Sequence, residues 1–551
     1  MLSSSAQAVM TVSLYRTGQG SYRGYATGAV SFSALSKETL LITQGHVDLF
    51  VADESVSDAV HLIYNLELLD IDGKKYILRG FKIIDSRITL SPLRTWAATM
   101  SLYTTIFRKD SLQVAKGILR LSPGDFVSEL LSLRCNPDFG LLQQIWVKAG
   151  FMSFFALNLM SYFLSPLRSL HYSASTQDYY RDWEKTRPDE TRIRSADGVV
   201  FSMKMWEPSS LVPARETPIV LIPGASVDHQ TFSLPTIPVN NIDYFTGLGY
   251  RCYLPVLRFG IGAEARNGWS VFDARLDVRA ALEYVRARED NKKAYAIVHC
   301  LGSIATATAL LQGDIEADWL RGMTCSQVFT DLIYSTDNHF KARHPSLIRL
   351  HKAIAGDWFS CRSSTSAPWT QYALDQVLRF YPIGSRKEIY NSASCHRCDL
   401  PFGRCWNHAN LNRATHARLD QYFDGIHMNF LTHLSRMGAK SPHHIRSDLL
   451  DFVDLVTPDN LQRLEGLKIC FLSGGDNAVW EPNATKKSFD MFRQMFPDGK
   501  YDRIVVQGYG HLDCWMGKDS SRDVYPRIYH HIRSCEQMQE AHRGNAISIL
   551  V

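Results

Sequence analysis

The chain has 551 residues, more than one hydrophobic core usually organises, so we expect two domains. With 45% hydrophobic and 21% charged residues, its composition is that of a folded protein and excludes wholesale disorder. The formal net charge is only +5 and the Lys and Arg residues are scattered, which gives nucleic-acid binding no electrostatic support.

The cysteines and the first residues bear on the cellular compartment. Eleven cysteines are spread along the chain without a pattern of disulfide pairing. The opening stretch, MLSSSAQAVMTVSL, lacks the basic start and the long apolar core of a signal peptide. We therefore expect a cytoplasmic protein with reduced thiols.

Residues 1–135 are predicted to form a smaller, antiparallel β-rich domain. The segment contains short runs rich in β-branched and aromatic residues, such as AVSFSALS and KETLLITQGHVDLFV, and turns separate these runs. The sequence Asp70-Ile71-Asp72-Gly73 lies between two alternating runs and is typical of a hairpin turn, because glycine adopts a positive φ at little cost.

Residues 136–175 are predicted to be an apolar helical linker. Between residues 145 and 164 the chain is nearly continuously apolar, and about 20 residues are enough to span a bilayer. Lys148 near the start, Asn158 inside the stretch and few cations before it favour a linker or docking helix. Peripheral membrane contact through residues 145–164 is the alternative, so association with a membrane stays open.

Residues 176–540 alternate strand and helix patterns, which predicts an α/β domain. An insertion with mixed helical patterns fills residues 330–460, and we expect it to form a helical lid. Aromatic side chains in the lid would make a pocket beneath it apolar and suited to a bulky lipophilic substrate. These aromatic residues are Phe402, Trp406, Tyr422 and Phe423.

The run AYAIVHC, residues 294–300, reads as a buried strand that ends in a cysteine, and a helix follows at once. A strand, a tight turn and a helix present the turn residue at the edge of the sheet, as in a nucleophile elbow. Such a turn needs small residues two positions before and after the nucleophile. Gly302 meets this requirement, whereas Val298 is larger than usual and could tilt the turn.

The partners of such a nucleophile should follow in the order acid and then histidine, each after a later strand. Asp476 follows the strand pattern LKICFLSGG, and His511 follows DRIVVQ. Two backbone N–H groups are also needed to hold an oxyanion. We expect them from Leu301, directly after the cysteine, and from Ala225 or Ser226 after the strand VLIPG, with Ala225 preferred.

These motifs carry a resemblance. Residues 190–535 look like an α/β-hydrolase, and in particular they are similar to the hydrolase module fused behind cholesterol-oxidase-like flavin oxidoreductases. The shared motifs are His-Cys-x-Gly-Ser at 299–303, Ser-Gln-Val at 326–328 and Gly-Tyr-Gly-His-Leu-Asp at 508–513. The resemblance implies a Cys-His-Asp triad in which Cys300 is the nucleophile, Asp476 the orienting acid and His511 the base.

The chemistry that follows is acyl transfer through a thioester. A thiol at a helix N-terminus beside a protonated histidine is expected to ionise readily. We therefore expect a hydrolase (esterase, lactonase or thioesterase) or an acyltransferase that needs no cofactor. By resemblance, its substrate would be a small lipophilic acyl compound, steroid, terpenoid or polyketide-like, in lipid or secondary metabolism. The alternative is a catalytically silent scaffold that docks a partner oxidoreductase or a membrane.

The lid also contains residues of the types that bind zinc. Cys395, Cys398, Cys405 and His408 have spacings that a tetrahedral zinc site could use. We expect no metal and a lid with reduced thiols, and a zinc site formed by these four candidates is the alternative.

Overall fold

The structure is a computed structural model, and the chain divides into two compact units. The first comprises Met1–Ser169 with Ile389–Asn391, and the second Leu170–Glu388 with Ser392–Val551. The residues that the structure describes are 6–18, 20–57, 59–168, 170, 172, 183–364, 368–385, 388 and 391–548.

The first unit is built on a seven-stranded antiparallel sheet in which neighbours in sequence are neighbours in space. Buried and exposed residues largely alternate along the strands, as in a sheet with one covered face. Leu40, Leu66 and Leu78 are among the buried side chains of its core. The strands are β1 (Ala6–Arg16), β2 (Tyr22–Phe32), β3 (Leu40–Ala52), β4 (Ala59–Leu69), β5 (Lys75–Asp85), β6 (Ser101–Arg108) and β7 (Gln113–Arg120).

The predicted hairpin turn between β4 and β5 is confirmed. Gly73 has a φ of 78° and donates its N–H to the carbonyl oxygen of Asp70 at 2.9 Å. The positive φ explains why a glycine stands at this place in the turn.

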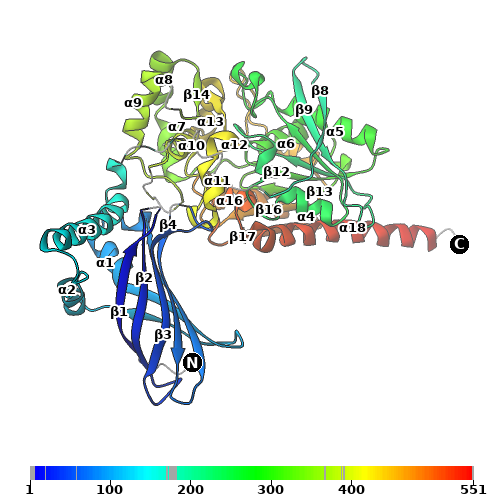
Figure 1. Cartoon of the computed structure of the whole chain (residues 1–551). Helices are drawn as coiled ribbons and strands as arrows, with labels where there is room; N and C mark the ends of the chain where they lie inside the picture. The colour runs from blue at the N-terminus through cyan, green and yellow to red at the C-terminus, as the bar shows by residue number, and fades with distance from the viewer. Residues whose placement is uncertain are drawn as a thin grey trace. The chain divides into compact units, whose positions relative to one another are not determined.

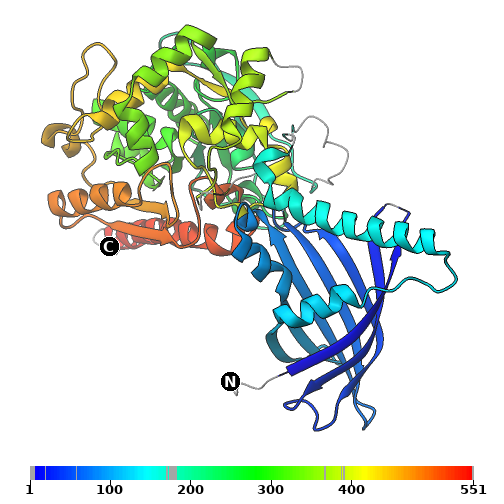
Figure 2. The ribbon, with the colours of Figure 1, turned by 90° about the vertical axis from the view of Figure 1, so that its left-hand side faces the viewer.

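The apolar segment 145–164 falls in α3 (Leu141–Phe163), which lies across the sheet of the first unit (Figure 2). One side of the helix packs on the core, where the ring of Phe154 lies 4.8 Å from that of Tyr22. Trp146 stays 77% exposed. Among the described helices, none combines the length and the hydropathy needed to cross a membrane. The other helices of this unit are α1 (Pro92–Met100) and α2 (Pro123–Leu131).

The second unit is built on an eight-stranded mixed sheet (Figure 1). Numbered one to eight along the chain, its strands stand in the order 1-2-4-3-5-6-7-8, and only the second is antiparallel to its neighbours. This arrangement confirms the α/β fold that the alternating strand and helix patterns predict. The strands are β8 (Asp189–Arg194), β9 (Val200–Trp206), β10 (Ile219–Ile222), β11 (Cys252–Val256), β12 (Ala294–His299), β13 (Leu320–Ser326), β16 (Ile469–Gly474) and β17 (Tyr501–Val506).

Helices pack on both faces of this sheet. On one face Phe245 of α4 and Ile528 of α18 share a buried core with Ile297 of β12. On the other face Phe492 of α15 contacts Phe471 of β16. The helices outside the lid are α4 (Asn241–Gly247), α5 (Arg275–Arg288), α6 (Leu301–Gln312), α15 (Asn483–Met495), α16 (Asp513–Met516), α17 (Ser520–Asp523) and α18 (Tyr525–Ser548).

The predicted insertion lies between β13 and β16 and is mainly helical. Its helices and the two strands of a small antiparallel sheet are α7 (Thr336–Arg343), α8 (Ser346–Ala355), β14 (Trp358–Ser360), α9 (Trp369–Leu378), α10 (Ala393–Phe402), α11 (Arg413–Ala417), α12 (Leu419–Tyr422), β15 (Gly425–His427), α13 (Met428–Ala439) and α14 (Pro458–Gln462).

Candidate active site

Cys300 occupies a sharp turn between β12 and α6. Its φ of 52° and ψ of −120° lie in a region that residues with a Cβ rarely adopt. Gly302 permits the close approach of the chain here, because a Cβ at this position would lie 2.4 Å from the carbonyl oxygen of Pro223. Val298 is fully buried in β12, and the turn forms despite its size. The predicted elbow is therefore present.

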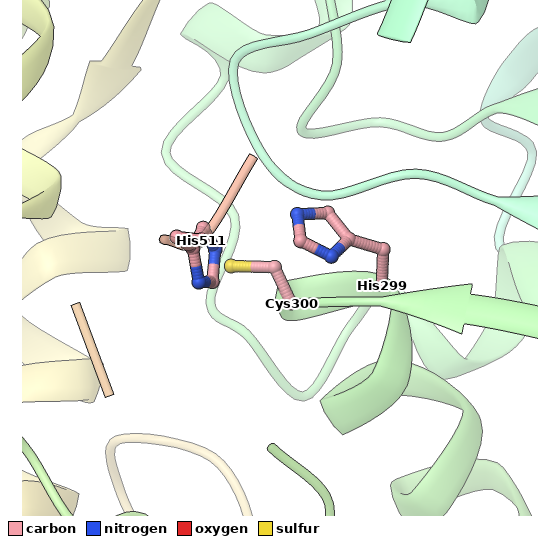
Figure 3. A group of neighbouring side chains, drawn as sticks. All are labelled: His299, Cys300 and His511. Carbon is pink, nitrogen blue, oxygen red and sulfur yellow. The ribbon is translucent and has the colours of Figure 1, made fainter. Parts of the chain in front are cut away.

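Two histidine rings lie next to the sulfur of Cys300. The Sγ atom and one ring nitrogen of each of His299 and His511 are all within 4.8 Å of one another, and the ring centroids are 4.7 Å apart. Figure 3 shows the Cys300 side chain directed at His511, with the His299 ring beside it. The structure thus brings the predicted cysteine and histidine together. It adds His299, which sequence reasoning missed although it directly precedes the cysteine.

Hydrogen bonding fixes the tautomer of His299. The indole Nε1 of Trp515 donates to Nδ1 of His299 at 2.9 Å, and an indole N–H can only donate. Nδ1 is therefore the unprotonated nitrogen, and the ring proton is on Nε2. Burial lowers the pKa of His299 well below its ordinary value, so the ring stays neutral. The role of a base is thus left to His511.

Asp476 lies in the loop after β16, next to the loop of His511. Its N–H donates to the carbonyl oxygen of Tyr509 at 2.8 Å. Within the described residues, however, the Asp476 carboxylate makes no hydrogen bond or ion pair, and the buried Nδ1 of His511 has no hydrogen-bond partner. The structure therefore places the predicted acid and base on adjoining loops without joining their side chains.

The two predicted oxyanion donors lie against the cysteine. In the loop after β10, a Cβ on Gly224 would lie 3.1 Å from the Cβ of Cys300, so this loop directly covers the thiol. The N–H of Ser226 is already bound to the carbonyl oxygen of Phe259 at 2.8 Å, whereas the N–H of Ala225 donates to no described residue. Leu301 directly follows Cys300 and lines the same cavity. Ala225 and Leu301 both line the cavity beside Cys300, and their role as oxyanion donors stays a prediction.

Burial favours the neutral forms of Cys300 and His511. It raises the pKa of the Cys300 thiol to about 12, and the Trp480 indole and the Leu301 N–H oppose this rise only in part. It lowers the pKa of His511 to about 3. The sequence-based expectation of a readily ionised thiol beside a protonated histidine is therefore wrong, because the site is buried and no charged partner among the described residues compensates either group.

The cysteine opens into a cavity of about 410 Å³ within the second unit. Its lining is mostly apolar and comes from the loop after β10, the elbow and the lid helices. Phe402 and Phe423 line it, as predicted, whereas Trp406 and Tyr422 are buried in the lid without being part of the described lining. The cavity has room for a bulky lipophilic group.

The four zinc candidates do not form one group. Cys395 and His408 come together with His416, with ligand atoms within 4.8 Å of one another, whereas Cys398 and Cys405 are not part of this group. Sγ of Cys395 lies 3.3 Å from Nε2 of His408. The indole Nε1 of Trp406 donates to the same Nε2 at 3.1 Å, so this lone pair is already used. A metal ion would have to displace this indole.

Comparisons with known proteins add a likeness in fold. No protein-family model and no curated protein matches the chain. Among solved structures, it is similar to a thermophilic esterase from Thermogutta terrifontis (11% identity, TM-score 0.39, 63% of this chain and 99% of that one). It is also similar to a monoglyceride lipase from Saccharomyces cerevisiae (13%, 0.39, 65% and 96%) and to an epoxide hydrolase from Vigna radiata (13%, 0.36, 64% and 100%).

Proposed function

We propose that this protein is an enzyme of the α/β-hydrolase type that cleaves or transfers acyl groups through Cys300. The observation that carries the proposal is the strained turn at Cys300, which directs a thiol at His511 and opens into a large apolar cavity. Residues with such backbone strain concentrate at functional sites.

In the acylation step, His511 takes the thiol proton as the sulfur attacks the carbonyl carbon of the substrate. Because both groups are neutral at rest, proton transfer and attack are coupled and need no preformed ion pair. The N–H groups of Leu301 and Ala225 hold the negative oxygen of the tetrahedral intermediate. As the intermediate collapses to a thioester, His511 returns the proton to the departing alcohol or thiol.

In the second step, an acceptor attacks the thioester. His511 takes a proton from water or from an alcohol, and the resulting tetrahedral intermediate expels the Cys300 sulfur, which recovers its proton from His511. Water gives hydrolysis and another acceptor gives acyl transfer. Both outcomes use the same residues.

Asp476 is proposed as the acid that orients His511. The backbone bond from Asp476 to Tyr509 supports this role, because it keeps the carboxylate on the loop beside the histidine. A rotation of the Asp476 side chain toward Nδ1 of His511 would stabilise the imidazolium that forms during the reaction.

The proposed substrate is an ester or thioester with a bulky lipophilic part, because the lining of the cavity is mostly apolar. The resemblance to the hydrolase module of cholesterol-oxidase-like fusions adds a steroid, terpenoid or polyketide-like skeleton to the proposed substrate. Contact with a membrane through residues 145–164 stays a prediction.

A catalytically silent scaffold is the second candidate. The missing bond between Asp476 and His511 and the raised pKa of Cys300 favour it. Such a scaffold would act by docking a partner oxidoreductase or a membrane.

Mass spectrometry separates the two functions. The protein is incubated with p-nitrophenyl decanoate and the reaction is quenched rapidly with acid. We expect an acyl adduct on Cys300 and a burst of p-nitrophenol. Cys300→Ala should give neither, and Cys300→Ser should keep a slow turnover. Cys135→Ala is the matched control for accessible thiols, because Cys135 is partly exposed and lies in the first unit. If the wild-type protein gives no adduct, or if Cys300→Ala is labelled equally, the silent scaffold is the function that remains.

A further inference from the structure

One strongly basic side chain lies in the mostly apolar cavity. Among the described lining residues, Lys341 on α7 is the only Lys, Arg, Asp or Glu. A cation in an apolar pocket costs free energy unless a partner compensates it. The position of Lys341 in this cavity therefore indicates that a partner, either the protein or a ligand, binds its ammonium group.

The protein itself satisfies the Lys341 ammonium only in part. Its Nζ donates to the carbonyl oxygen of Leu400 at 2.7 Å, and it forms no ion pair in the described parts of the chain. The nearby carboxylate of Asp399 is occupied by the N–H groups of Gly384 at 2.7 Å and Cys405 at 2.9 Å. Burial lowers the pKa of Lys341 to about 8, so most of the population is still protonated at neutral pH. Two N–H donors remain for a ligand.

Asn338 lines the cavity one turn before Lys341 on the same face of α7. Its Nδ2 donates to the carbonyl oxygens of Phe402 at 2.7 Å and Val479 at 3.0 Å, which fixes the orientation of the amide. Its Oδ1 is buried and has no hydrogen-bond partner among the described residues, and the residue as a whole is only 7% exposed. A buried acceptor without a partner costs free energy, so a ligand donor here would be favourable.

Both polar heads are held by carbonyl oxygens of one short segment at the end of α10, Lys341 by Leu400 and Asn338 by Phe402. A hydroxyl is the group that satisfies both, since its oxygen accepts from the ammonium and its hydrogen donates to the amide oxygen. A carboxylate would satisfy Lys341 but would place a second acceptor against Oδ1 of Asn338.

We propose that the lipophilic substrate carries a hydroxyl group remote from the scissile bond, and that Lys341 and Asn338 bind it. This inference rests on the proposed function and names the substrate class of the same site. The apolar wall would hold the skeleton, the hydroxyl would fix how deeply it enters, and the ester would lie at Cys300.

The test is a homologous series of p-nitrophenyl esters from hexanoyl to tetradecanoyl, with a terminal methyl, hydroxyl or carboxylate. At one chain length we expect the hydroxyl ester to exceed the methyl ester in kcat/KM by at least about tenfold. Lys341→Met should remove this ratio and Lys341→Arg should keep part of it. Lys352→Met is the matched control and should leave the ratio unchanged, because Lys352 pairs with Asp357 at 2.8 Å outside the lining.

Binding without turnover distinguishes a failure of the inference from a failure of the proposed function. With the Cys300→Ala protein, ω-hydroxy fatty amides should raise the melting temperature more than the plain amides do, and Lys341→Met should cancel the difference. If no ester is cleaved but this difference is seen, the proposed function fails and the hydroxyl site stands. Equal shifts for both amides, no hydroxyl preference at any length, or a preference for the carboxylate would overturn the inference.

Discussion

The indole N–H of Trp515 holds His299 in a single tautomer directly beside the thiol of Cys300. The two histidines at the sulfur therefore differ in what they can do. Among the described residues His511 has no carboxylate partner, and it can accept a proton, whereas His299 already carries its proton on Nε2 and can only donate.

Replacing His299 with Phe is expected to lower the rate of Cys300 acylation by about tenfold or more, because a hydrogen bond to a charged group contributes about 1.5–3 kcal/mol. His299→Gln, which keeps an N–H donor, should recover part of the rate. Rapid-quench measurement of the acyl adduct reports this step. Unchanged acylation in His299→Phe would mean that the ring only fills space.

The reactivity of Cys300 is expected to rise with pH far beyond the neutral range. Since burial raises its pKa to about 12, alkylation by iodoacetamide should increase by about tenfold per pH unit through the range where an ordinary thiol levels off near 8.5. A small-molecule thiol measured alongside is the control. A plateau near neutral pH would show instead a thiolate–imidazolium pair.

The protein is expected to lose stability as the pH falls below about 6.5. Burial lowers the pKa of His511 to about 3 and that of His433, on α13, to about 4, so between these values and 6.5 the unfolded chain binds protons that the folded one does not. Urea unfolding at neutral pH and at about pH 5 should show a lower free energy of unfolding in acid. His433→Leu should reduce the difference, and an unchanged difference would contradict the assignment.

Gly302→Ala is expected to destabilise the fold by about 1–3 kcal/mol or more and to lower activity, because the new Cβ would lie 2.4 Å from a backbone oxygen of Pro223. Gly247→Ala is the control within the same unit, since a Cβ there meets nothing within 4 Å and alanine favours a helix. Thermal unfolding and ester turnover check both variants. Equal melting temperatures would mean that the elbow has room to shift.

The protein is expected to contain no stoichiometric zinc, because the Trp406 indole already binds Nε2 of His408. Trp406→Phe, which removes the indole N–H, should increase the affinity for added zinc at Cys395, His408 and His416. Elemental analysis and titration with Co²⁺ measure occupancy. One equivalent of zinc in the untreated wild type, lost in His416→Ala, would show that the indole moves aside.

The elbow was predictable from the sequence because its constraints are local. An apolar strand, a cysteine and a glycine two positions later require a particular backbone, and Cys300 adopts it. The strand pattern likewise places Asp476 and His511 after two successive strands, in the order acid and then histidine. What spacing cannot give is the rotamer of each side chain, so the absent bond between Asp476 and His511 and the neutral state of the site were not foreseen.

Contacts between distant segments were also beyond the sequence. Hydropathy indicates that residues 145–164 are apolar, but it does not say that Phe154 packs on Tyr22. In the lid, ligand spacing suggested four zinc candidates, whereas folding groups His416 with only two of them.

The backbone at Cys300 would suit a glycine better than any residue with a side chain. Exchanging Cys300 for Gly should therefore relieve about 1 kcal/mol or more of torsional strain. The resulting protein should be more stable but lack the proposed nucleophile. Stability of the fold and reactivity of the thiol therefore oppose each other at this position. A screen for thermal stability alone would select against the cysteine.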